Sequence, residues 1–384
     1  MNILVLTLSF GSGHVSAARA VAKEIKRQSP SADVRVVDAL TECHPLFRAG
    51  YEWPYWLMLR YAPGIWDRLA SARIKQKHES TAPDWAFRFG CRKVFQTIEN
   101  FQPDLMVAVE VAAGEISAIA RRMKITRAPI LSVITDYEAE PVWIKPEVAA
   151  FTVADHHGRS ELIEWGAPPD NIFVTGIPID RSFTVKHDER ATRLRHGIND
   201  RLPIVLLMGG GMGPTRMDEV ARELADTEVG AHLIAIAGKD DRARRRLESL
   251  RVKDRMSLRV LGWTDDVPAL MQAAAILVTK PGGLTMLEAA SCSLPLVLFD
   301  PIPGAEFINA KRMVDAGTAV LTRGARETAA QVLSLLLDQK ARNAMAVNAR
   351  RIARPQAREE IAELALRLAA SDRPATARAA RRSA

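Results

Sequence analysis

The sequence is poor in cysteine, the residue that forms the disulfides of small secreted domains and ligates the metal ion in many metal sites. Its 384 residues include three cysteines, Cys43, Cys91 and Cys292, which are far apart and show no metal-ligand spacing. An odd and scattered set of this kind is typical of reduced thiols in a cytosolic protein. The composition therefore indicates neither a disulfide framework nor a metal site.

Long apolar runs are also missing, although 48% of the residues are hydrophobic. No run approaches the roughly 18–20 residues that a membrane-spanning helix needs. Met1-Asn2 passes directly into the apolar segment Ile3–Leu8, so no signal peptide is expected. The sequence thus predicts a cytoplasmic protein with sizeable cores and no spanning helix.

Aromatic residues are scarce and unevenly placed. The chain has 7 Trp, 4 Tyr and 11 Phe, and Tyr51–Trp66 alone holds Tyr51, Trp53, Tyr55, Trp56, Tyr61 and Trp66. The basic stretch Arg68–Lys93 follows, within a net charge of +8. Rings beside cations suit an anionic membrane surface, although an aromatic-rich core helix or helical hairpin remains the alternative. No nucleic-acid partner is expected, because no helix-turn-helix, zinc finger or aromatic RNA-binding pattern is present.

The length predicts two domains. Apolar strands alternate with amphipathic helices in both halves, which is the pattern of parallel, doubly wound α/β sheets. We therefore expect two Rossmann-like domains. The expected parts are an N-terminal domain over 1–183, a linker over 184–201, a C-terminal domain over 202–345, C-terminal helices over 346–371 and a disordered basic tail over 372–384.

The segment Thr279–Ala289, TKPGGLTMLEA, is the strongest candidate for a binding site. A short apolar strand leads into Gly282-Gly283 and then into a helix whose first N–H groups point outward, an arrangement that binds anions. Glycine lets a phosphate approach the backbone closely. Glu288, farther along the helix, is placed to accept hydrogen bonds from the vicinal hydroxyls of a sugar. The alternative is an ordinary strand-to-helix turn with a solvated glutamate.

Two further segments support a nucleotide-sugar site in the second half. Pro303–Ala310, PGAEFINA, places Glu306 and Asn309 on one helical face. Leu202–Gly213 is a strand that runs into GGGMG and so brings Gly211 and Gly213 to a second glycine-rich turn. Trp263 follows Gly262 in a loop expected at the same edge.

The first glycine loop precedes a histidine. Gly11-Ser12-Gly13-His14 joins an apolar strand to a helix, and Ser16 replaces the third glycine of a dinucleotide-binding fingerprint. A histidine at a helix N-terminus favours the neutral imidazole, which can accept a proton from a hydroxyl. Asp136 ends a later strand and is a second candidate, because such positions face the ligand crevice. A capping or core histidine and a turn-capping aspartate are the alternatives.

Together these motifs resemble those of the GT-B glycosyltransferases, whose two Rossmann-like domains face each other across a cleft. TKPGGLTMLEA, PIPGAEFINA and the G-x-G-H loop resemble more narrowly the monogalactosyldiacylglycerol synthase and processive diacylglycerol glucosyltransferase family, a relative of the peptidoglycan N-acetylglucosaminyltransferase. The resemblance implies UDP-glucose or UDP-galactose as donor and diacylglycerol as acceptor. It further implies inversion to a β-glycolipid by a peripheral enzyme on the inner face of the cell membrane, with the last helix crossing back to the first domain.

The resemblance also implies roles for the candidate residues. His14 would be the catalytic base, with Asp136 as a second catalytic candidate, and Glu288 would bind the ribose. The other nucleotide-sugar positions would be Gly13, Gly211, Gly213, Trp263, Gly282, Gly283, Leu284, Thr285, Glu306 and Asn309. No Asp-x-Asp occurs in the chain, so no obligatory metal or other cofactor is expected.

The sequence departs from the family pattern at two positions. EAEPVW, with Glu140, stands where the family has a histidine before an apolar residue and Trp, and Ala305 stands where a glutamine is common. A UDP-sugar epimerase of the same fold and a non-catalytic nucleotide-sugar sensor are the remaining alternatives. A nicotinamide dehydrogenase is the weakest candidate, because neither glycine loop completes its motif.

Overall fold

The computed structural model describes the chain except for residues 10–11, 62–79, 210–215, 254, 303 and 372–384. The chain divides into two compact units. Unit 1 comprises Met1–Asp180 and the segment that begins at Gln356, and unit 2 comprises Arg181–Pro355. Among the described ranges, no helix is both long enough and apolar enough to cross a bilayer.

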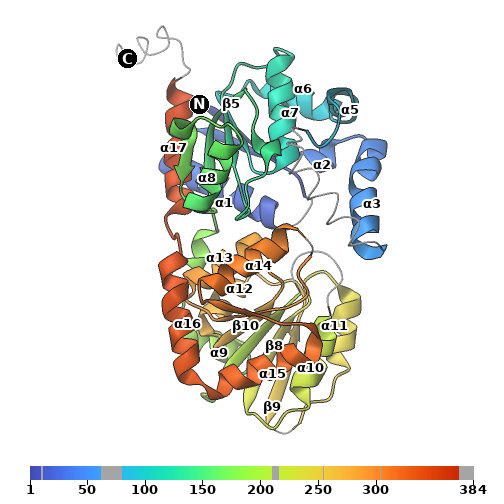
Figure 1. Cartoon of the computed structure of the whole chain (residues 1–384), viewed down its shortest axis with the longest axis vertical. Helices are drawn as coiled ribbons and strands as arrows, with labels where there is room; N and C mark the ends of the chain where they lie inside the picture. Colours follow the sequence, from blue (N-terminus) through green and yellow to red (C-terminus); the bar gives the residue numbers. More distant parts are fainter. Residues whose placement is uncertain (10–11, 62–79, 210–215, 254, 303, 372–384) are drawn as a thin grey trace. The chain divides into compact units, whose positions relative to one another are not determined.

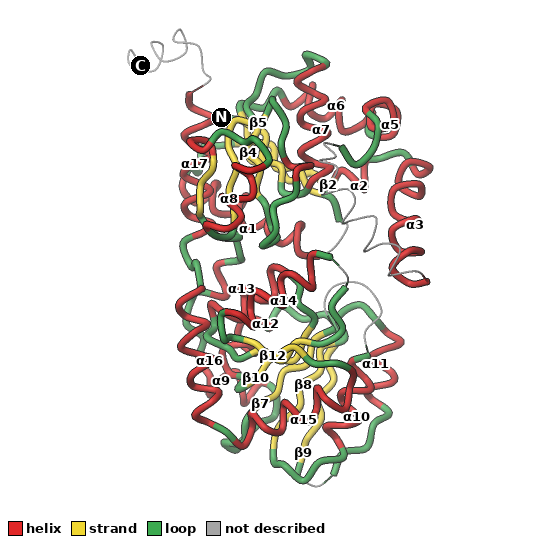
Figure 2. The backbone as a smooth tube through the Cα atoms, viewed as in Figure 1, coloured by secondary structure: helices red, strands yellow, loops and turns green. Residues whose placement is uncertain are grey.

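Unit 1 is built on a parallel sheet with the strand order β2-β1-β3-β4-β5-β6 (Figure 2). The strands are β1 (Asn2–Thr7), β2 (Asp33–Asp38), β3 (Leu105–Ala108), β4 (Ile130–Val133), β5 (Val148–Val153) and β6 (Ile172–Val174). Every residue of β3 and β4 is buried, as expected for parallel strands covered on both faces.

The strand order of unit 1 reverses between β1 and β3. The chain passes from β1 outward to β2 and then returns to place β3 on the other side of β1. Leu6 is paired with Ala108, so the carboxyl ends of β1 and β3 lie side by side. Ligands of open α/β sheets bind outside the carboxyl ends of the strands at such a reversal.

Unit 1 also contains several helices. They are α1 (Ser12–Gln28), α2 (Ala39–Glu42), α3 (Pro45–Tyr61), α5 (Asp84–Gly90), α6 (Arg92–Phe101), α7 (Val111–Arg122), α8 (His156–Glu164) and α17 (Ala357–Ser371). The last helix, α17, packs along α1 (Figure 1), and Gln28 Nε2 donates a hydrogen bond to the Glu359 carbonyl at 3.2 Å.

Unit 2 repeats the architecture with the strand order β12-β11-β10-β7-β8-β9, and every neighbouring pair is parallel. The strands are β7 (Ile204–Met208), β8 (Ala231–Ile236), β9 (Met256–Leu261), β10 (Ile276–Thr279), β11 (Leu296–Leu298) and β12 (Ala319–Leu321). Here the order reverses between β7 and β10. The expected pair of doubly wound sheets is therefore confirmed.

The helices of unit 2 include two that the sequence analysis placed elsewhere. They are α9 (Glu189–Arg195), α10 (Met217–Ala225), α11 (Asp241–Glu248), α12 (Val267–Ala273), α13 (Gly283–Ser291), α14 (Ala305–Asp315), α15 (Gly324–Leu337) and α16 (Gln339–Ile352). Within the expected linker 184–201, Asp188 caps α9, which packs on α12. Within the expected group 346–371, α16 ends before Pro355 and stays in unit 2, so only α17 belongs to unit 1.

Candidate functional site

Unit 1 brings polar side chains together at the carboxyl ends of β1, β3 and β4. His14 lies in the first turn of α1, Glu110 follows β3, and Thr135-Asp136 follow β4. The three strands are neighbours in one parallel sheet, so these connections meet at the same edge. The candidate base therefore lies at the reversal in strand order, where a ligand site is expected.

His14 is oriented by a threonine. Its Nδ1 lies 2.8 Å from Thr135 Oγ1, and Thr135 is only 2% exposed. This contact engages Nδ1, so Nε2 is the ring nitrogen that could exchange a proton with a ligand. The sequence analysis named Asp136, the next residue, which is half-buried. A pattern that only marks the end of a strand cannot show which of two consecutive side chains turns toward the histidine.

Glu110 is an acidic residue at this edge to which the sequence analysis gave no role. The structure ends β3 at Ala108 and makes Glu110 the N-cap of α7, where its carboxylate accepts hydrogen bonds from Ala112 N at 2.7 Å and Ala113 N at 3.3 Å. Burial raises the pKa of Glu110, and the positive charge of His14 opposes this rise. The sequence feature that could have pointed to Glu110 is its position directly after the apolar run PDLMVAV, where an acidic residue is expected at the end of a strand.

In unit 2, backbone groups that no side chain covers lie at the carboxyl end of β10. Gly282 is the N-cap of α13, and glycine carries no side chain that could cap the helix. A Cβ placed on Gly282 would meet no atom within 4 Å, so the turn is open on that side. The first turn contains Gly283, Leu284 and Thr285, and the N–H groups and dipole of such a helix end can hold an anion. Glu288 lies half-buried in the next turn.

The second motif of unit 2 packs against this turn. Glu306 lies in the first turn of α14 and accepts a hydrogen bond from Ile302 N at 2.7 Å. Asn309 is 1% exposed, and its Nδ2 lies 3.5 Å from the Pro281 carbonyl. The structure thus brings PGAEFINA against TKPGG, two segments that the sequence could not place relative to each other.

Lys280 is a cation of this edge to which the sequence analysis gave no role. It is 5% exposed and directly precedes the Pro281-Gly282 turn. Burial lowers the pKa of Lys280, and the negative charges of Glu306 and Asp300 oppose this fall. Asp300, just after β11, also forms an ion pair with Arg216. The sequence feature that could have pointed to Lys280 is its position directly before the glycine turn.

The remaining predicted positions are only partly described. Gly211 and Gly213 lie outside the described residues, as does Gly11 of the first loop. Gly13 is the second residue of α1. Trp263 is 62% exposed, and Lys239 Nζ lies 5.2 Å from the centre of its ring. An aromatic ring with a cation over its face is therefore exposed in unit 2.

Comparisons with known proteins assign both units. Residues 14–179 match the family described as "Monogalactosyldiacylglycerol (MGDG) synthase", and residues 196–352 match "Glycosyl transferases group 1". The first part of the chain thus resembles monogalactosyldiacylglycerol synthases, and the second part resembles group 1 glycosyltransferases. The resemblance expected from the motifs is thereby confirmed.

Individual relatives agree with this assignment. The chain is 27% identical over 348 residues to a processive diacylglycerol beta-glucosyltransferase of Bacillus licheniformis, with 90% of each protein covered. The crystal structure of Acinetobacter baumannii MurG matches with a TM-score of 0.62 and 16% identity, over 95% of this chain and 99% of that one. A UDP-GlcNAc 2-epimerase from Neisseria meningitidis bound to UDP-GlcNAc matches with a TM-score of 0.61 and 14% identity, over 96% of this chain and 100% of that one. The GT-B fold of this glycosyltransferase is therefore confirmed.

Proposed function

We propose that this chain is an inverting glycosyltransferase that moves a hexose from a UDP-sugar to diacylglycerol, or to a glycosyl-diacylglycerol, and forms a β-glycolipid. The observation that carries the proposal is His14, which Thr135 orients at the reversal in strand order of the monogalactosyldiacylglycerol synthase domain. A diacylglycerol glucosyltransferase that matches over most of the chain supports the acceptor.

The donor would be UDP-glucose or UDP-galactose, held by unit 2. The diphosphate would lie on the N–H groups of Gly283, Leu284 and Thr285, because a glycine N-cap leaves that helix end open to an anion. Lys280 would add a buried positive charge directly before the turn. Glu288 would accept hydrogen bonds from the ribose hydroxyls.

Other residues of unit 2 would complete the donor site. Glu306 and Asn309 would contact the hexose or the diphosphate, since Asn309 lies against the Pro281 carbonyl at the same turn. Trp263, with Lys239 over its ring, would cover the uracil. Gly211 and Gly213 would contact the diphosphate, and Gly13, the second residue of α1, would also contact the nucleotide sugar.

The reaction would be a single displacement. Nε2 of His14 would take the proton from the acceptor hydroxyl, and the oxygen would attack the anomeric carbon from the face opposite the leaving group. The bond to the diphosphate would break, and UDP would leave with its electron pair. The N-terminal dipole of α13 and Lys280 would stabilise the charge that develops on UDP. Asp136 is the next candidate base.

Two helices of unit 1 carry an exposed apolar surface that fits a membrane interface. On α3 it comprises Leu46, Trp53, Leu57 and Tyr61, and on α5 it comprises Trp85 and Phe89. The positions 53, 57 and 61 are spaced by four residues and so share one helical face. Another face of α3 is anchored, because Phe47 packs on Phe87 with the ring centres 5.5 Å apart.

This surface would attach the protein to the inner face of the cell membrane as a peripheral enzyme. The sequence analysis considered only Tyr51–Trp66 as the aromatic part of a membrane surface, and the structure adds the exposed rings of α5. Trp66 and the side chains of Tyr55 and Trp56 lie outside the described residues. Exposed rings at the level of the lipid headgroups, with the basic residues Arg88 and Arg92 nearby in the sequence, support this attachment.

One assay tests the proposed function. The full chain is incubated with vesicles that contain diacylglycerol and, separately, with UDP-glucose, UDP-galactose or UDP-N-acetylglucosamine, and the lipid products are identified by mass spectrometry and NMR. A β-linked hexosyl-diacylglycerol is the expected product. An epimerised nucleotide sugar without any lipid product would instead favour the epimerase that the structural likeness to the Neisseria enzyme suggests. Donor binding without turnover would favour a sensor.

A further inference from the structure

An ion pair at the edge of unit 2 joins two connections that are far apart in the sequence. Arg216 is the N-cap of α10, and Asp300 follows β11. Nε of Arg216 donates to Asp300 Oδ2 at 2.9 Å, and Nη2 donates to Oδ1. The guanidinium therefore binds the carboxylate side-on, through two of its nitrogens.

The sheet places this ion pair at the carboxyl end of β10. That strand is paired on one side with β7, which precedes Arg216, and on the other side with β11, which precedes Asp300. Thr279 ends β10, and its carbonyl accepts a hydrogen bond from Phe299 N at 3.1 Å. Lys280 and Asp300 are the next residues of two segments whose backbones lie about 5 Å apart. The ion pair thus lies beside the turn that begins at Lys280.

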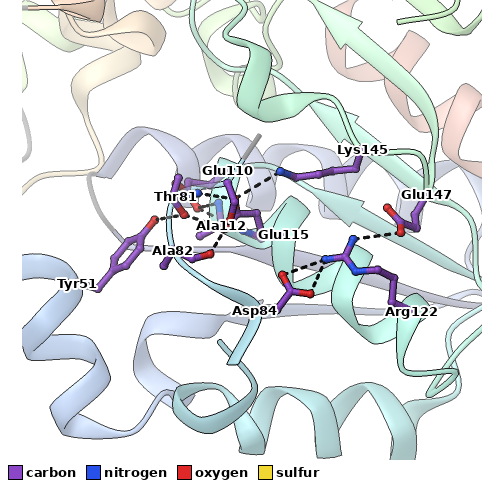
Figure 3. Close-up of polar contacts among 12 residues, drawn as sticks. Tyr51, Thr81, Ala82, Asp84, Glu110, Ala112, Glu115, Arg122, Lys145 and Glu147 are labelled. Carbon is purple, nitrogen blue, oxygen red and sulfur yellow. Dashed lines mark hydrogen bonds and ion pairs between the residues drawn. The ribbon is translucent and has the colours of Figure 1, made fainter. Parts of the chain in front are cut away.

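An arginine of unit 1 is held differently (Figure 3). Arg122, at the end of α7, donates from Nη2 to Asp84 at 3.1 Å and from Nη1 to Glu147 at 3.1 Å. Both of its terminal nitrogens are engaged by carboxylates of other segments, so Arg122 connects parts of the fold. Among the described residues, the side-chain hydrogen bonds of Arg216 go to Asp300, through Nε and Nη2.

The guanidinium of Arg216 is accessible to a ligand. Its side chain is 52% exposed, whereas that of Asp300 is 17% exposed. Nη1 carries N–H groups that the side-on contact does not use, and an arginine can donate to two anions at once. Asp300 thus orients the guanidinium from the protein side and leaves donors for a second anion.

We propose that Arg216 binds the diphosphate of the nucleotide sugar and that Asp300 is the positioning residue that directs its guanidinium to this anion. The inference rests on the proposed function, because it takes the N-terminal end of α13 as the diphosphate site. Arg216 keeps its contact with Asp300 and donates from Nη1 to phosphate oxygens, a double contact that a lysine cannot make. It supplies a fixed positive charge where UDP becomes more negative on leaving.

Calorimetric titration of the full chain with UDP and with uridine tests the assignment. Arg216→Met should weaken UDP binding by roughly 10- to 100-fold, because charge-assisted hydrogen bonds to the diphosphate are lost. Arg216→Lys should recover only part of this affinity, since an ammonium group cannot hold Asp300 side-on and contact phosphate together. Uridine, which has no phosphate, should bind equally to the wild type and to both variants.

Arg122→Met is the matched control, because Arg122 is also a partly exposed arginine held by a carboxylate but belongs to unit 1. It should bind UDP as the wild type does, and thermal unfolding checks that every variant folds. Unchanged UDP affinity in Arg216→Met overturns the proposal. An equal loss for uridine, or an equal loss in Arg122→Met, overturns it as well, because the effect would then not depend on a diphosphate contact.

Asp300→Asn tests the positioning role through a change of sign. In the otherwise unaltered chain it should weaken UDP binding, because Arg216 loses the group that orients it. In the Arg216→Met background, Asp300 is an unpaired anion beside the diphosphate, so Asp300→Asn should strengthen UDP binding instead. Weaker binding in both backgrounds would show a merely structural Asp300 and would reject its positioning role.

Binding and transfer together separate this inference from the function on which it rests. If the wild-type chain transfers no sugar but Arg216→Met selectively loses UDP affinity, the proposed glycosyl transfer fails and the role of Arg216 stands. If the wild-type chain transfers sugar and Arg216→Met binds UDP normally, the inference alone fails. A wild-type chain that does not bind UDP rejects both.

Discussion

The two units share one architecture but present different chemistry at the edges where their strand orders reverse. In unit 1 the edge carries polar side chains: His14 with its partner Thr135, and Glu110, which caps α7. In unit 2 it carries open backbone at Gly282 and the buried cation Lys280. In both units the doubly wound sheet determines where the site lies, and the residues directly after the strands determine the chemistry that we propose for it.

The largest expected effect concerns the proton-transfer edge. His14→Ala should lower kcat by about 10²–10⁴-fold, because that is the usual loss when a general base is removed. The affinity for UDP should stay nearly constant, because UDP is expected on unit 2. His157→Ala, on α8 of the same unit, is the control and should keep normal turnover. Steady-state kinetics and calorimetric titration with UDP measure the two quantities.

The pH dependence of the transfer rate further tests the proposed role of His14 in unit 1. The acid limb of the wild-type rate should be absent in His14→Ala, since the neutral imidazole is the active form. Near-normal turnover of His14→Ala would reject the assignment and make Asp136 and Glu140 the next residues to test. Loss of UDP affinity in His14→Ala would contradict the division of roles between the two units.

On the anion-binding edge, Glu288→Ala should raise KM for the donor by roughly 10- to 100-fold. A hydrogen bond to a charged group contributes about 1.5–3 kcal/mol, which corresponds to that range. Glu223→Ala, an exposed glutamate on α10, is the matched control. Calorimetry with UDP and with uridine would show whether the loss is common to both, as a ribose contact requires. Unchanged donor affinity removes Glu288 from the site.

Lys280→Met should weaken UDP binding by roughly 10-fold, because it removes a charge-assisted contact to the diphosphate. The ammonium form is the one that binds, and burial lowers the pKa of Lys280 below the usual 10.5. Wild-type affinity should therefore fall with rising pH, at a pH below that at which an exposed lysine loses its proton.

The control for this variant is Lys311→Met on α14, an exposed lysine paired with Asp315. It should bind UDP normally and retain the alkaline fall, whereas Lys280→Met should lose that fall. An identical alkaline fall in Lys280→Met would assign it to another group, and undiminished affinity would place Lys280 outside the diphosphate site.

An effect as small as that of Lys280→Met is expected away from both edges. Trp53→Ser with Trp85→Ser should weaken binding to anionic vesicles by roughly 10-fold, since burying one large apolar side chain contributes about 1.5–3 kcal/mol and only part of each ring enters the interface. Vesicle sedimentation measures this binding. Leu337→Ser, an equally exposed apolar residue of unit 2, should have no effect. Equal losses in both variants would mean that no particular membrane surface exists.

Local patterns were enough for most of the fold. The apolar runs at Ile3–Leu8 and Ala275–Val278, each followed by a glycine turn and an amphipathic helix, predicted strand and helix because burial and backbone geometry act over short segments. The domain and helix boundaries were harder to predict where the secondary structure of a segment depends on its packing against other elements. Residues 189–195 look like a charged linker but form α9, since Asp188 caps the helix and α12 supplies a surface for it.

By itself, the sequence determined the kind of protein: two parallel α/β sheets, a histidine and glycine turns at strand ends, and the motifs of a glycosyltransferase. The tertiary structure alone decided which groups meet. Thr135 reaches His14 across 121 positions of sequence, and Asp300 forms its ion pair with Arg216 across 84. The physical reason is that parallel strands far apart in the chain end at one edge, and strand order, which no local pattern encodes, determines the side chains that share it.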